Sequence, residues 1–181
     1  LSLCNKNMVK MDTNNDDSSK AKNDLLVDVC LAAKFEAESL EKYRAQYQNK
    51  YDDSPSQICT MLARSFADIG DIVRGRDLYL GNKKEKENLE NNLKRIFQEI
   101  YNNLDGKIKS NYNDSEGNYY QLRSAWWEAN RQEVWKAIIC GAAGGRYFRK
   151  TCGSGEWTDY NCRCLIGDVP TYFDYVPQYL R

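Results

Sequence analysis

Cysteines, carboxylates and scattered cations are the residues best able to do chemistry in this chain, because the sequence contains no histidine. Without histidine, Ser-His and Cys-His nucleophiles and metal-bound water held by imidazole are excluded. Two pairs of carboxylates, Asp68 with Asp71 and Glu36 with Glu38, could in principle act as acid and base. Carboxylates on a helix surface are far more often solvated or paired with Arg or Lys. We therefore predict that the chain is not an enzyme and uses no cofactor.

The cysteine count is high for an ordinary cytosolic protein, with seven in 181 residues. Zinc is the alternative to disulfides, but there is no Cys-x-x-Cys pair, and the closest spacing is Cys162-Arg163-Cys164. We therefore expect disulfide bonds and no metal site. The odd count leaves one cysteine free or paired outside this sequence, and Cys4, close to the start, is the expected one.

Cations occur in several short groups, and the segment Arg146-Tyr147-Phe148-Arg149-Lys150 combines them with aromatic rings, which suits a sulfated sugar. A charge run is usually only a solvated face. Each surface ion pair contributes about 0–1 kcal/mol, so several contacts have to act together. Trp157 lies in a Gly-rich loop and is the candidate exposed aromatic. The candidate binding residues are Lys83, Lys84, Lys86, Lys107, Lys109, Arg146, Arg149, Lys150 and Trp157.

The glycine run Gly141 to Gly145 does not fit a phosphate-binding loop. It lacks the closing Gly-Lys-Ser/Thr, and it follows a predicted helix rather than a strand. The alternative, a helix end followed by a loop, is preferred.

Overall charge gives no reason to expect a polyanionic partner, since 26 Lys and Arg balance 26 Asp and Glu. A nucleic-acid partner is therefore not predicted. No apolar run approaches the roughly 20 residues that cross a bilayer. With no secretory signal at its start, and with 181 residues, the chain reads as a soluble fragment of about one domain.

Four amphipathic helices are predicted from apolar residues spaced three and four apart. They cover Asp24 to about Tyr51, the run from about Ser56 to Gly75, Lys83 to Leu104, and Tyr119 to Cys140. In the second, Ile58, Leu62, Phe66 and Ile69 share one face, and Gly70 and Gly75 are expected to mark a helix stop or hinge. Three tryptophans of the fourth, Trp126, Trp127 and Trp135, are expected in the core.

Five blocks of sequence resemble the Duffy-binding-like domain, in the alpha class of the variant erythrocyte membrane proteins of malaria parasites. They are LLVDVCLAAKFEAESL from Leu25, ICTMLARSFADIGDIVRGRDLY from Ile58, AWWEANRQEVWKAIIC from Ala125, YFRKTC from Tyr147 and CRCLIGDVPTYFDYVPQYLR from Cys162. The resemblance implies an all-α, disulfide-clamped helical bundle with long irregular loops. It also implies three segments: 1–57, the end of a first subdomain; 58–169, a central bundle; and 170–181, the start of a truncated third.

Functionally, the resemblance implies an extracellular adhesion module on the infected red-cell surface, as part of a single-pass membrane protein. The implied partners are red-cell receptors that support rosetting: heparan sulfate, blood-group sugars or complement receptor. The alternative is a structural or antigenic spacer that packs against neighbouring domains and binds no receptor.

Six cysteines allow 15 pairings. Cys30 and Cys140 lie on the apolar stripes of two strong helices, so a bond between them would join those helices. Cys162 and Cys164 are too close to pair comfortably. We therefore expect Cys30–Cys140, Cys59–Cys164 and Cys152–Cys162, with Cys4 bonded to a cysteine outside the fragment.

Overall fold

The computed structural model describes residues 6–9, 20–48, 57–77, 83–142 and 144–181. Within these residues the chain is helical and contains no strand, and its one isolated bridge joins Gly145 and Asn161. The predicted all-α fold is therefore confirmed. The elements are α1 (Lys6–Val9), α2 (Ala21–Gln48), α3 (Gln57–Arg74), α4 (Lys83–Asn102), α5 (Gly106–Lys109), η1 (Ser110–Tyr112), α6 (Tyr120–Ile138), η2 (Phe173–Tyr175) and η3 (Gln178–Leu180).

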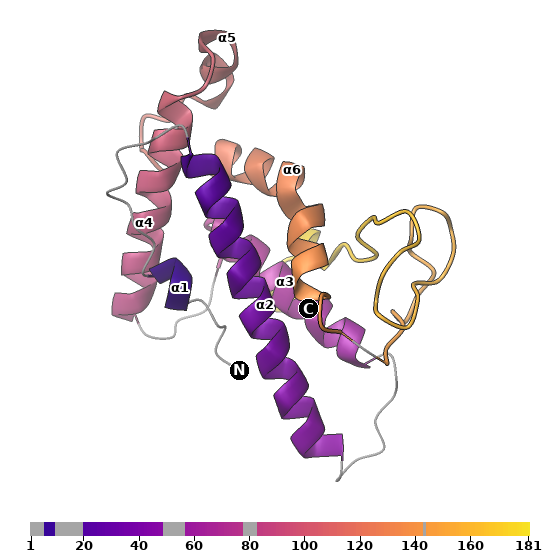
Figure 1. Cartoon of the computed structure of the whole chain (residues 1–181). Helices are drawn as coiled ribbons and strands as arrows, with labels where there is room; N and C mark the ends of the chain where they lie inside the picture. Colours follow the sequence, from indigo (N-terminus) through magenta and orange to yellow (C-terminus); the bar gives the residue numbers. More distant parts are fainter. Residues whose placement is uncertain (1–5, 10–19, 49–56, 78–82, 143) are drawn as a thin grey trace.

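Three long helices, α2, α3 and α6, pack against one another, and α4 with the short α1 covers one side of them (Figure 1). The α5 turn projects beyond the far end of α4. On the opposite side of the bundle the chain after α6 forms an irregular lobe, residues 144–169, before it returns to the bundle. The bundle thus carries two separate protrusions.

The core follows the apolar stripes predicted from the sequence. In α3, Ile58, Leu62, Phe66 and Ile69 are fully buried. The Phe66 ring lies 5.1 Å from that of Trp127 and 5.3 Å from that of Trp135, centroid to centroid. Both tryptophans come from α6 and are buried, as is Trp126. The prediction that these three tryptophans belong to the core is therefore confirmed.

Gly70 and Gly75 have different roles, and the first was predicted wrongly. Gly70 lies inside α3, where a Cβ atom would come within 2.7 Å of the Trp127 ring. Its missing side chain therefore allows α3 and α6 to approach closely. Gly75 follows the helix with a φ of 71°, in the left-handed region that favours glycine, so it is the helix stop.

Helix boundaries differ from the predictions by a few residues. α2 begins at Ala21 instead of Asp24, and its predicted end near Tyr51 lies outside the described residues, as does Ser56, the predicted start of the second helix. α4 ends at Asn102 instead of Leu104, and Asp105 then caps α5 by accepting a hydrogen bond from the Lys107 N–H at 2.9 Å. None of the described helices combines the length and the hydropathy of a membrane span. The division into three segments at 57 and 169 stays a prediction.

The close α3–α6 approach predicts that Gly70→Ala destabilises the protein by about 1–3 kcal/mol, because the buried Trp127 ring cannot move aside. Urea unfolding followed by circular dichroism measures this. Gly106→Ala is the matched control, since nothing lies within 4 Å of a Cβ there. Equal stability of the two variants would contradict the proposed packing role of Gly70.

Candidate functional site

Residues 170–181, which follow the lobe, form the C-terminal segment. It is held to the bundle by a buried carboxylate, Asp174 in η2. Its Oδ2 accepts hydrogen bonds from Trp127 Nε1 at 2.9 Å and from Arg131 Nε at 2.8 Å. Its Oδ1 accepts a second bond from Arg131, Nη2 to Oδ1, at 2.8 Å. The pair is bidentate, and the Asp174 side chain is wholly buried while that of Arg131 is 12% exposed. Both donors come from α6, so the ion pair fixes η2 against that helix.

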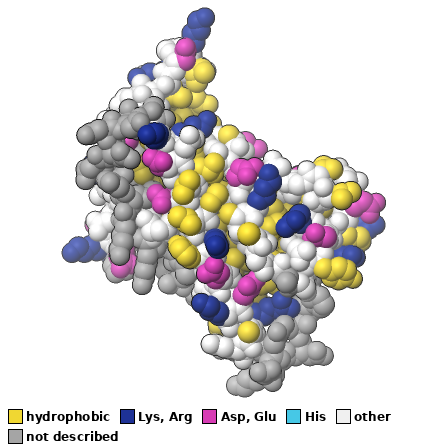
Figure 2. All heavy atoms as spheres, in the orientation of Figure 1, with side chains coloured by type: hydrophobic (Ala, Val, Ile, Leu, Met, Phe, Trp, Pro, Cys, Tyr) yellow, Lys and Arg dark blue, Asp and Glu magenta, His cyan; other side chains and the backbone are white. Residues whose placement is uncertain are grey.

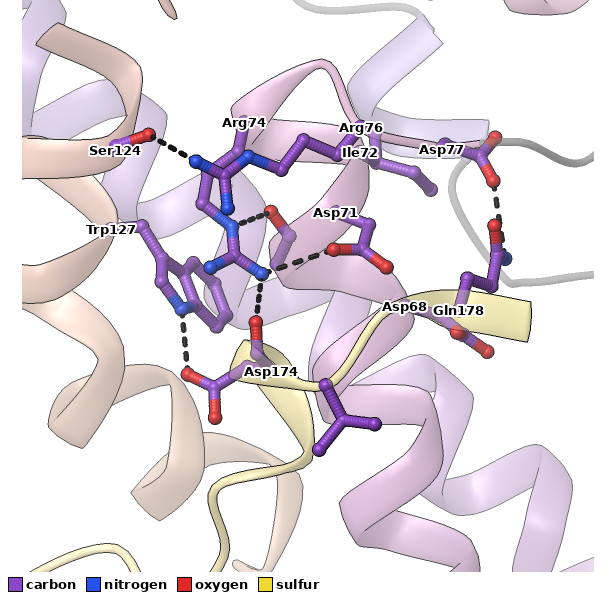
Figure 3. A network of polar contacts seen from close by, with 12 residues as sticks. Asp68, Asp71, Ile72, Arg74, Arg76, Asp77, Ser124, Trp127, Asp174 and Gln178 are labelled. Atoms are coloured by element: carbon purple, nitrogen blue, oxygen red, sulfur yellow. Dashed lines mark hydrogen bonds and ion pairs between the residues drawn. The ribbon is translucent and has the colours of Figure 1, made fainter. Parts of the chain in front are cut away.

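A second buried arginine, Arg74, holds the same segment to α3 (Figure 3). Its guanidinium donates to the carbonyls of Gly70 and Asp174 and to Asp71 Oδ1, the last at 3.0 Å. Arg181 near the end of the segment donates to Asp68 Oδ1 at 3.1 Å and to Asp71 Oδ2. Asp68 and Asp71 are thus partners of arginine, as expected of most helical carboxylates. We call the group Asp71, Arg74, Trp127, Arg131 and Asp174 the polar clamp.

Burial and ion pairing shift the pKa values of the two clamp arginines in opposite directions. Burial lowers the pKa of Arg131, but the hydrogen bonds and the charge of Asp174 outweigh it, so the pKa is raised overall. The pKa of Arg74 is lowered by burial and by the nearby charge of Arg76. At the outer edge of the clamp, burial and a hydrogen bond to Glu128 raise the pKa of Tyr175 to about 12. The arginines stay charged at neutral pH, as ion pairing with Asp174 requires.

Two disulfides tie the lobe to α3 and to itself, and their pairing differs from the prediction. Cys59 bonds to Cys162 and Cys152 bonds to Cys164, so the predicted pairs Cys59–Cys164 and Cys152–Cys162 are wrong. The reason is local: Gly145, just after α6, donates to the Tyr160 carbonyl and accepts from the Cys162 N–H at 3.2 Å. This backbone contact brings Cys162 next to the bundle, while Cys164 continues to the outer turn.

The predicted Cys30–Cys140 bond is also wrong, because both cysteines are free thiols. α2 and α6 run in the same direction, with Cys30 beside Glu133 and Glu41 beside Gly141. Cys140 lies past the end of α6 at Ile138 and is exposed, instead of on the predicted apolar stripe, and it is seven positions beyond Glu133. Bonded cysteines need Cα atoms within about 6.8 Å.

Burial and Glu133 raise the pKa of the Cys30 thiol. Cys4 lies outside the described residues.

Hydrogen bonds between distant residues give the lobe a fixed frame. The Tyr147 N–H donates to Thr158 Oγ1 at 2.9 Å, and the Tyr147 hydroxyl donates to Thr171 Oγ1 at 3.1 Å. Arg131 also donates to the Thr171 carbonyl at 2.9 Å. The same arginine therefore joins the polar clamp to the base of the lobe.

Four of the predicted binding residues lie on this one lobe. Arg149, Lys150 and Trp157 are exposed, whereas Arg146 is half-buried with its guanidinium 4.6 Å from the centre of the Tyr160 ring. Arg149 stacks on Phe148 at 5.1 Å. Arg146 therefore supports Tyr160 more than it offers a free charge, while Arg149, Lys150 and the exposed Arg163 face solvent.

The other five predicted residues lie elsewhere. Lys83, Lys84 and Lys86 are in the first turn of α4, and Lys107 and Lys109 are in α5, past its other end. A 20-residue helix separates the two groups by about 30 Å. Lys86 contacts Asp77, and Lys109 lies 4.8 Å from the centre of the Tyr101 ring. The nine candidates do not form one site, and their role in binding stays a prediction.

Sequence reasoning missed the most exposed apolar residues of the lobe. Leu165 is 91% exposed, and Ile166 and Tyr160 are each 63% exposed. The available signal was two large aliphatic residues in a short segment between Cys164 and Gly167, where no helical period could bury them. Figure 2 shows hydrophobic side chains among basic and acidic ones on the right-hand side of the molecule, with no block of one sign.

Potential ligand atoms of Cys152, Cys164 and Asp168 lie within 4.8 Å of one another. The two sulfurs are joined in a disulfide, so they are not available as thiolate ligands in this state. The two cysteines form a buried disulfide that stabilises the lobe.

Comparison with known proteins gives one family. The family model of the Duffy binding domain matches residues 1–181. No curated protein matches.

Solved structures of PfEMP1 domains are similar to the chain. The NTS-DBL1(alpha-1) domain of PfEMP1 from the Plasmodium falciparum varO strain is 38% identical with a TM-score of 0.79, over 98% of this chain and 39% of that one. The NTS-DBL1-alpha and CIDR-gamma double domain of the same strain is 40% identical with a TM-score of 0.70, over 87% and 23%. A PfEMP1 DBLβ domain bound to human ICAM-1 is 32% identical with a TM-score of 0.65, over 87% and 30%. The chain thus spans well under half the length of each.

The lobe geometry predicts a definite peptide map. Non-reducing proteolysis and mass spectrometry should join the Cys59 peptide to that of Cys162 and the Cys152 peptide to that of Cys164. Cys30 and Cys140 should react with an alkylating reagent once the protein is unfolded without reduction. A Cys59–Cys164 peptide would contradict the frame described for the lobe.

Proposed function

Since the chain belongs to the Duffy binding domain family, we propose that it is part of an adhesion module which binds a receptor on host red cells through the 144–169 lobe. PfEMP1 domains of this fold include a DBLβ domain solved in complex with human ICAM-1, so the fold supports attachment to a host surface protein. We further propose that the chain lies on the extracellular face of the infected red cell, and that its binding contributes to rosetting.

The proposal is supported by a lobe that is held rigidly and that exposes side chains suited to binding. Two disulfides and the polar clamp hold the lobe, and the lobe displays exposed aromatic, aliphatic and cationic side chains. Aromatic residues and arginine dominate binding energy in protein interfaces. A rigid display lowers the entropy lost on binding. A spacer would have no need of such a surface.

The charges of the lobe limit how much a sulfated glycan can contribute. Arg149, Lys150 and Arg163 are exposed, but so are Glu156 and Asp159. Heparan sulfate, blood-group sugars and complement receptor are the predicted partner classes, and they differ in salt dependence. Binding through so few net cations should weaken only modestly as salt rises.

The proposal predicts that the complete adhesion domain carrying this chain binds human red cells in flow cytometry, and that Arg149→Glu with Lys150→Glu weakens binding several-fold. Both side chains are exposed, so the fold should not change. Lys34→Glu with Lys42→Glu is the matched control, because it makes the same charge change at exposed positions in α2 that are not among the candidate binding residues.

Heparin and red cells of each blood group identify the partner class in the same assay. Equal loss of binding in the two charge-reversed variants would contradict a role for the lobe. No binding of the unaltered domain to any cell would favour the spacer alternative.

A further inference from the structure

We propose that the turn formed by Cys164, Leu165, Ile166 and Gly167 is a preformed apolar plug that enters a hydrophobic cleft on a host cell-surface protein. This inference rests on the proposed function. The turn forms the centre of the contact between the lobe and its partner, and that partner is a protein.

Leu165 and Ile166 occupy unusual positions for large aliphatic residues. The Gly167 N–H donates to the Cys164 carbonyl at 3.0 Å, which makes this a four-residue turn with Leu165 and Ile166 at its two corners. Such corners usually hold Gly, Pro, Asn, Asp or Ser. Both side chains remain largely exposed. Large apolar side chains gathered at the surface are a mark of interaction sites.

Three bonds hold the two ends of the turn. Cys164 is bonded to Cys152, and Gln132 of α6 donates to the Gly167 carbonyl at 2.8 Å. The next residue, Asp168, accepts the Gly153 N–H at 2.5 Å. The turn therefore loses little conformational entropy when a partner covers it.

Gly153 also sets the position of Ile166. A Cβ atom at Gly153 would lie 3.4 Å from Ile166 Cδ1 and 3.2 Å from Asp168 Oδ2. Without that Cβ, Ile166 has room to lie against the neighbouring turn. One side of Ile166 therefore rests on the neighbouring turn, while most of its side chain and nearly all of Leu165 stay exposed.

The charges around the turn favour a protein partner. Arg163 precedes the turn and Asp168 follows it, and the rest of the lobe mixes both signs. An anionic membrane or a sulfated polymer would be matched by a cluster of basic residues. A central apolar anchor within a polar rim of both signs is the arrangement of protein interfaces.

The decisive variant replaces both anchors, Leu165→Ser with Ile166→Ser, in the complete adhesion domain. Serine is a common turn residue, so the turn should persist, and the Cys152–Cys164 peptide checks this. The control is Ile108→Ser, which removes a half-exposed aliphatic side chain from the distant α5. We expect red-cell binding at least tenfold weaker in the double variant and unchanged in the control. Equal binding by all three proteins would overturn the plug and leave the proposed function intact, whereas no binding by the unaltered domain would overturn both.

A photo-crosslinking residue at position 165 identifies what covers the turn. With p-benzoylphenylalanine there, illumination on red cells should join the domain to a host membrane protein, and the same residue at position 108 should not. Crosslinks to lipid, or only to the domain's own polypeptide, would overturn the inference.

Discussion

The ion pair between Arg131 and Asp174 is the constraint on which the arrangement of this protein depends most. Both oxygens of a fully buried carboxylate are satisfied by α6, while Arg74 of α3 reaches the backbone of the same residue. A buried charge with a missing partner costs about 3–5 kcal/mol, so the segment that carries Asp174 has one stable position against α6. Arg131 also donates to the carbonyl of Thr171, just after the lobe, so the ion pair fixes the position of the end of the lobe. The Cys59–Cys162 bond joins the lobe to α3 as well.

A second buried ion pair, between Arg123 and Glu90, joins α6 to α4. Arg123 is fully buried and pairs with both oxygens of Glu90, at 2.7 and 2.9 Å, and it donates to the carbonyls of Ile72 and Val73 at the end of α3. It therefore supplies a donor to the Val73 carbonyl, one of the groups that have no partner within the helix at its end. Through Arg123 and Arg131, α6 links α3, α4 and the C-terminal segment with charge-assisted bonds. The apolar core reaches only the inner part of the lobe, through Tyr147, Cys162 and Val169.

The sequence predicted the parts of this structure that follow from periodic burial. The apolar stripe of α3 and the core tryptophans are where the three-and-four spacing placed them. It could not predict the disulfides, because Cys162 and Cys164 are two residues apart and the choice between them depends on the contact of Gly145 with Cys162. It placed Cys30 and Cys140 on facing helices but gave no information on their offset along the axis. Gly70 reads as a helix breaker in sequence, and only the position of Trp127 reveals it as a contact point. The exposure of Leu165 and Ile166 had no periodic signal at all.

The most direct test of this account is a double-mutant cycle between Arg131 and Asp174, measured by urea unfolding with Arg131→Met, Asp174→Asn and the combination. If the pair holds the segment, Asp174→Asn alone costs about 3 kcal/mol or more, because Arg131 is left buried without its partner. The two changes together then cost about 1–3 kcal/mol less than the sum of the single changes. Costs that add within about 0.5 kcal/mol would show that the pair is not coupled, and would contradict its place as the constraint that holds the C-terminal segment and the lobe.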